Sequence, residues 1–73
     1  MNSSIILQDP IIKNGKQYGY VAIEQKAAAY YVNVYLTNIC IIDLCIETKK
    51  AVDYFHALHL MTIAKNKYTE KRD

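Results

Sequence analysis

The sequence predicts an α+β domain, in which a three- to four-stranded antiparallel β-meander is followed by one C-terminal α-helix packed on one sheet face. Asn14-Gly15 lies between two apolar runs, which is the strongest short signal of a β-hairpin. Residues 29–36 and 39–47 are rich in β-branched and aromatic side chains, as in half-buried strands. Residues 49–67 contain no Gly or Pro, and their apolar side chains recur at helical spacing.

The chain has 73 residues and a net charge of +2, which predicts one domain over residues 1–73. Within it we expect an edge strand or covering segment at 1–13, a sheet at 16–47, a helix at 48–68 and a basic tail at 69–73. Residues 1–64 carry equal numbers of acids and lysines, so the excess charge lies in the last nine residues. Such cations are typical of a helix C-terminus.

The first hairpin is expected to pair residues 5–13 with 16–25. Pro10 has no N–H to donate to a ladder, so its strand belongs at a sheet edge or is broken there. In the alternative arrangement, residues 1–13 fold over the outer face of the sheet.

The next two strands are expected at 29–36 and 39–47, and their alternation defines two faces. Tyr30, Val32, Val34 and Leu36 share the core face, whereas Tyr31, Asn33 and Tyr35 share the outer face. A three-residue loop at 36–38 pairs Val34 with Cys40 and Val32 with Ile42. This register is preferred because it keeps Asp43 out of the core.

Thr48 is the expected helix N-cap. One stripe of the helix runs through Ala51, Phe55, Leu58 and Thr62, and we expect Phe55 and Leu58 to pack on Val32, Val34, Ile42 and Leu44. A second stripe has the 3-4 spacing of a helix–helix seam. Its members are Tyr54, Ala57, Met61, Ala64 and Tyr68.

Cys40, Cys45, His56 and His59 approach the spacing of a zinc finger. Five residues apart on one strand, the cysteines point to opposite faces, and no glycine turn between them would bring both to one ion. The sequence also lacks a glycine-rich phosphate loop and a nucleophile–base–acid pattern. We therefore expect no metal, no cofactor and no enzymatic activity.

The compartment is expected to be the cytoplasm. The same alternation prevents a disulfide between Cys40 and Cys45, and two cysteines do not form the framework of a secreted mini-protein. The segment from Met1 to Lys13 lacks the basic leader of a signal peptide, and no apolar run approaches a membrane span.

The tyrosines suggest a function. One helix covers one sheet face, and the other face is too apolar for a solvated sheet. We therefore expect a small protein–protein interaction module, acting as a homodimer, inhibitor or accessory subunit. Its expected interface combines an outer sheet patch with the helix seam, which is favoured for self-association: Tyr31, Tyr35, Ile39, Ile41 and Cys45, with Tyr54, Ala57, Met61, Ala64 and Tyr68.

The alternative is a small nucleic-acid-binding domain with a sheet-plus-helix topology. Aromatic side chains on a sheet can stack on bases. The expected neighbours Asp43 and Glu47 would repel phosphate, so a protein partner is preferred.

Overall fold

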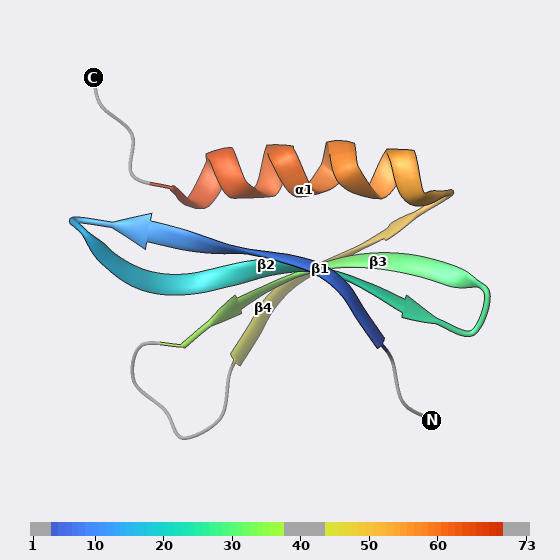
Figure 1. Cartoon of the computed structure of the whole chain (residues 1–73), viewed down its shortest axis with the longest axis horizontal. Coiled ribbons are helices and arrows are strands. Elements are labelled where there is room, and N and C mark those ends of the chain that lie inside the picture. Colours follow the sequence, from blue (N-terminus) through green and yellow to red (C-terminus); the bar gives the residue numbers. More distant parts are fainter. Residues whose placement is uncertain (1–3, 38–43, 70–73) are drawn as a thin grey trace.

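The computed structural model describes residues 4–37 and 44–69 and arranges them as a four-stranded antiparallel sheet with one helix across one face (Figure 1). The strands follow one another in the order β1-β2-β3-β4. The elements are β1 (Ser4–Lys13), β2 (Lys16–Lys26), β3 (Ala29–Leu36), β4 (Leu44–Ala51) and α1 (Tyr54–Tyr68). The predicted α+β class, with a meander followed by a C-terminal helix, is confirmed.

The first hairpin turns at Asn14-Gly15, as the sequence predicts. Both residues have positive φ, 53° and 76°, and Lys13 pairs with Lys16 across the turn. Gly15 suits this conformation because it has no Cβ to clash. β1 lies at the edge of the sheet and contains Pro10. The described part of the N-terminal segment is therefore an edge strand, not a cover over the outer face.

A tight turn at residues 27–28 joins β2 to β3, and Ala27 there has a φ of 57°. From Gly19 opposite Leu36 to Lys26 opposite Ala29, the pairing of these strands is uninterrupted. This register places the side chains of the two central strands in matching rows on each face.

The fourth strand ends later than the sequence predicts, at Ala51. Val34 pairs with Glu47 and Val32 with Lys49, so the predicted partners Cys40 and Ile42 are wrong. Residues 38–43 lie outside the described residues. The sequence predicts Asp43 and Glu47 on the outer face. Glu47 instead lies on the helix-covered face, where Tyr68 and Lys67 bind its carboxylate.

The helix also begins later, because Thr48 is a strand residue opposite Asn33 and is not an N-cap. Asp53 caps the helix instead, and its Oδ1 accepts a hydrogen bond of 2.8 Å from the backbone N–H of His56. Continuing β4 to Ala51 buries that small side chain opposite Tyr30, with 3% of its surface exposed. The strand therefore extends across the Thr48–Lys49 position where the sequence suggested a helix start.

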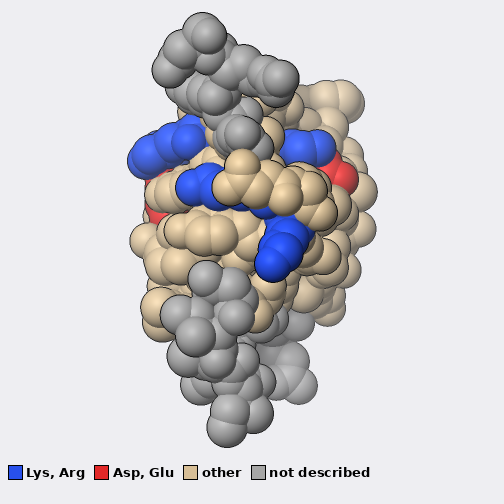
Figure 2. Space-filling view, turned by 90° about the vertical axis from the view of Figure 1, so that its left-hand side faces the viewer, with Lys and Arg blue, Asp and Glu red and all other residues tan. Residues whose placement is uncertain are grey.

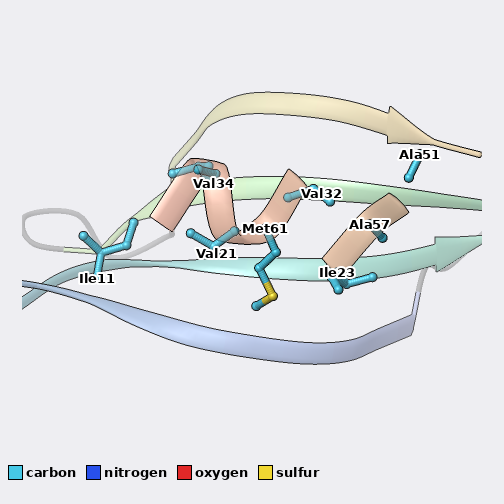
Figure 3. Close-up of a cluster of buried hydrophobic side chains, with 9 residues drawn as sticks. Ile11, Val21, Ile23, Val32, Val34, Ala51, Ala57 and Met61 are labelled. Carbon is cyan, nitrogen blue, oxygen red and sulfur yellow. The ribbon is translucent and has the colours of Figure 1, made fainter. Parts of the chain in front are cut away.

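The core lies between the helix and one face of the sheet, which we call the inner face (Figure 3). Its members come from all five elements: Ile11, Val21, Ile23, Val32, Val34, Ala51, Ala57, Met61 and Ala64. The small side chains of Ala57 and Ala64 allow close approach of the helix, and Met61 lies between them along α1. Flexible Met fills irregular space in such a layer.

The predicted helix face is therefore wrong in part. Phe55 is 78% exposed, because two residues correspond to about 200° of helix and place it opposite Ala57. Leu58 is partly buried and packs against the core, as the sequence predicts. Of the predicted sheet partners, Val32 and Val34 are buried, Leu44 is 58% exposed, and Ile42 lies outside the described residues.

Candidate functional site

The face of the sheet opposite the helix, here called the outer face, carries a cluster of aromatic and polar side chains. Strand alternation and register place these side chains there from three strands: Tyr20, Ala22, Glu24 and Lys26 of β2, Tyr31, Asn33 and Tyr35 of β3, and Cys45, Thr48 and Lys50 of β4. Among the described elements, α1 packs on the inner face and none packs on this one (Figure 1).

Three tyrosines dominate the outer face. Tyr20 and Tyr35 are paired across β2 and β3, and their rings stack with centroids 4.9 Å apart and an interplanar angle of 26°. Tyr31 lies nearer the start of β3, opposite Glu24 and Lys50. All three side chains are partly buried. Rings held in this way present apolar area with little rotational freedom left to lose on binding.

A polar network lies within this cluster. The Tyr35 hydroxyl donates a hydrogen bond to Glu24 Oε2, and Asn33 Nδ2 donates to the Tyr35 hydroxyl at 3.3 Å. Glu24 is only 7% exposed, although its strand presents it on the face opposite the helix. Burial raises the pKa of Tyr35, and the hydrogen bond to Glu24 raises it further, so Tyr35 stays protonated and keeps donating.

Asn33 supplies an unused acceptor at the same place. Its Oδ1 is buried and has no hydrogen-bond partner within the described residues. A buried amide oxygen without a partner is costly, and a donor from a bound molecule would satisfy it.

An open hollow of about 500 Å³ follows these side chains. It is lined by Glu24, Lys26, Ala27, Tyr31, Asn33, Tyr35, Cys45 and Thr48. Cys45 is exposed as a free thiol, with its Sγ 3.4 Å from Thr48 Oγ1. The site therefore combines aromatic surface, a buried carboxylate and hydroxyl groups.

The sequence-predicted outer patch is partly assembled by the fold. Tyr31, Tyr35 and Cys45 share the outer face, with Tyr35 directly opposite Cys45. Ile39 and Ile41 lie outside the described residues. The sequence places Asn33 on this face but does not mark it as an interface residue, and it gives no sign that Tyr20 and Glu24 join the cluster. The register of β2 with β3 follows from the two-residue turn at Ala27-Ala28. Two alanines are not a recognised hairpin signal, so the sequence does not predict this turn.

The predicted helix seam is not an open surface. Ala57, Met61 and Ala64 are 0%, 4% and 8% exposed, and they pack on the sheet. Tyr54 and Tyr68 are partly buried against the same core. This part of the predicted interface is wrong because a 3-4 spacing also marks the stripe that a helix lays on its own sheet.

The described residues considered for zinc lie on different elements of the fold. Cys45 is on the outer face, whereas His56 Nδ1 accepts a hydrogen bond of 3.1 Å from the backbone N–H of Val52 at the helix start. His59 is exposed on the helix, and Cys40 lies outside the described residues. Within residues 4–37 and 44–69, no three His, Cys, Asp or Glu side chains are grouped to hold a metal ion.

Several lysines lie at one end of the molecule, where the β1–β2 turn and the C-terminus of α1 are found (Figures 1 and 2). Two of them connect the helix to the sheet: Lys65 Nζ lies 3.6 Å from Asp9 Oδ2, and Lys67 Nζ lies 3.4 Å from Glu47 Oε1. Figure 2 shows acidic atoms at the margins of this end. Two of the lysines at this end are therefore paired with acids of the sheet.

No described helix has the length and hydropathy needed to cross a membrane. Comparison of the chain with protein-family models, with curated proteins and with solved structures finds no match.

Proposed function

We propose that the chain is a non-enzymatic protein–protein interaction module that docks a partner protein on the outer face. The observation that supports it most directly is the tyrosine cluster (Tyr20, Tyr31 and Tyr35) on the sheet face that no described element covers. A solvated antiparallel sheet face carries mainly polar side chains. Here it carries large rings around a buried carboxylate.

The chemistry of the cluster suits a protein surface. Tyrosine is enriched at interfaces because it adds a large apolar area and a hydroxyl at small entropic cost. The hydrogen bonds among Glu24, Tyr35 and Asn33 fix the central side chains before binding. The free Asn33 Oδ1 offers one directional acceptor, which a backbone or side-chain N–H of the partner would fill. Pre-organisation of this kind lowers the cost of association.

In this role the chain works as an inhibitor or accessory subunit in the cytoplasm. A reducing compartment keeps an exposed thiol such as Cys45 from oxidising.

Affinity capture from host lysate with a truncated tyrosine tests the proposal. Tyr31→Ala removes an aromatic ring from the outer face, and Phe55→Ala removes one from the exposed side of α1. We expect the Phe55→Ala protein to retain the wild-type partner and Tyr31→Ala to lose it, because truncating a central aromatic costs about 2 kcal/mol or more of binding. Retention by Tyr31→Ala with loss by Phe55→Ala would reject the outer face.

A second candidate, binding of single-stranded nucleic acid, gains one observation from the structure. Glu47, expected from the sequence to repel phosphate beside the tyrosines, lies on the inner face bound to Tyr68. The outer face instead has Lys26 at one end of β2 and Lys50 opposite Tyr31. Bases stacked on tyrosine with phosphates near lysine are a known mode of binding.

Fluorescence anisotropy with a labelled single-stranded oligonucleotide separates the two candidates. Nucleic-acid binding predicts an affinity that falls steeply as salt is raised, and a shallower salt dependence after Lys26→Ala and Lys50→Ala. An unchanged anisotropy at low salt would exclude it and leave the protein partner.

A further inference from the structure

We infer that two copies of this chain associate through the free edge of β4, with the strands antiparallel and Thr48 on the two-fold axis. The inference does not depend on what the outer face binds, because the strand edge and the sheet face are different surfaces. Among the described strands, β4 has a neighbour on the β3 side alone. Its other edge presents backbone N–H and C=O groups, which are a template for another strand.

The two sheet edges are not equivalent. β1 contains Pro10 and has two register irregularities, between Ile5 and Leu7 and between Ile11 and Ile12. Proline and bulges are features that protect an edge from pairing. β4 has no proline, and its irregularity lies near its start, between the pairs made by Glu47 and Cys45. Residues 47–51 therefore form an uninterrupted stretch available for pairing.

The charges of β4 select the register. In a two-fold antiparallel pair, each inner-face side chain of one copy lies opposite an inner-face side chain of the other. This follows because side chains alternate between the faces with a period of two residues. With Thr48 opposite Thr48, Glu47 of each copy faces Lys49 of the other. Centring the pair on Lys49 or on Glu47 would instead place like charges opposite each other. Opposite charges across strands stabilise a pair, and like charges destabilise it.

The apolar side chains near the ends of β4 fit the same arrangement. Leu44 and Ile46, near its start, are 58% and 39% exposed, and Val52, directly after its end, is 84% exposed. Antiparallel pairing brings the start of one strand beside the end of the other. The exposed apolar side chains of each copy would then lie close together.

The resulting dimer has one continuous eight-stranded sheet. The two-fold axis is perpendicular to the sheet, so both helices lie on one side and both outer faces lie on the other. The tyrosine clusters of the two copies then lie on the same side of the dimer.

Charge exchange tests the register by sedimentation over a series of protein concentrations. Wild type should dimerise. Lys49→Glu places two acids opposite each other and should weaken dimerisation by roughly tenfold or more. Lys50→Glu makes the same charge change on the next residue, which faces the other side, and should dimerise like wild type. A mixture of Lys49→Glu with Glu47→Lys should form a heterodimer, because the opposite charges face each other again.

Cross-linking provides a second measurement if Glu47→Lys does not fold. In a Cys40→Ser, Cys45→Ser background, Thr48→Cys should form a disulfide-linked dimer under mild oxidation. Lys50→Cys should not, because its two copies would be about 13 Å apart along the strands at about 3.3 Å per residue. A monomeric wild type at high concentration overturns the inference. So does equal cross-linking of the two cysteine variants.

Discussion

Glu24 and Glu47 show how neighbouring side chains determine the position of a carboxylate in so small a domain. Glu24 is buried on the outer face and accepts a hydrogen bond from Tyr35. Glu47 is on the inner face, where Tyr68 donates to its Oε1 at 2.6 Å and Lys67 lies 3.4 Å away. Each acid is tied to another element, so both contribute to the geometry of the fold rather than to a solvated surface.

Glu47 predicts a pH dependence of stability. The hydrogen bond from Tyr68, with Lys67 beside it, lowers the pKa of Glu47 in the folded protein. A lowered pKa stabilises the fold at neutral pH, and this contribution is lost as pH falls through the folded-state pKa. Between about pH 5 and pH 3, the urea midpoint of wild type should therefore fall more steeply than that of Glu47→Gln. Parallel curves for the two proteins would contradict this assignment.

Met61 and Phe55 give opposite predictions for two large helix residues. Met61 is 4% exposed within the core, so Met61→Ala should destabilise by about 2–5 kcal/mol. Phe55→Ala should change stability by about 0.5 kcal/mol or less, because Phe55 is 78% exposed. Equilibrium urea unfolding of both variants measures the difference. A larger loss for Phe55→Ala would restore the helix face that the sequence predicted.

At the scale of elements, sequence signals succeeded where local chemistry decides the structure. Asn14-Gly15 fixes a turn by backbone conformation alone, and the alternation of residues 29–36 gives the correct inner and outer faces of β3. The end of β4 and the start of α1 could not be obtained in this way. Thr48-Lys49-Lys50 is compatible with either element, and the choice depends on pairing with β3 and on burial of Ala51.

The outer-face cluster was predictable only in part, because some of its members come together through pairing between strands. Tyr31 and Tyr35 share a face by alternation within one strand, whereas Tyr20 and Glu24 join them through the register of β2 with β3. That register depends on the turn at Ala27-Ala28, which carries no glycine or asparagine. The helix seam was misassigned because spacing alone does not say which partner a stripe contacts.

The two candidate N-caps allow a direct test of the helix boundary. Asp53→Ala removes the acceptor for the His56 N–H and should cost about 1 kcal/mol. Thr48→Ala should cost less than that on an exposed position of an edge strand. Thermal melts monitored by circular dichroism compare the variants. A larger loss for Thr48→Ala would support a helix that begins at residue 49.

At the scale of the whole molecule, the tyrosines divide between the two faces of one sheet. Tyr18, Tyr30, Tyr54 and Tyr68 pack against the core. The remaining three of the seven form the cluster on the outer face. The first four tyrosines complete the core between α1 and the sheet, whereas the outer three remain for a partner protein. The proposed function depends on this division.

Tyrosine-specific NMR tests that division most directly. With ring carbons labelled in tyrosine alone, the chain gives signals from seven residues, which can be followed as the captured partner is added. We expect the signals of Tyr20, Tyr31 and Tyr35 to shift or broaden while those of the four core-side tyrosines stay in place. Shifts confined to Tyr18, Tyr30, Tyr54 and Tyr68, with the outer three unchanged, would contradict it.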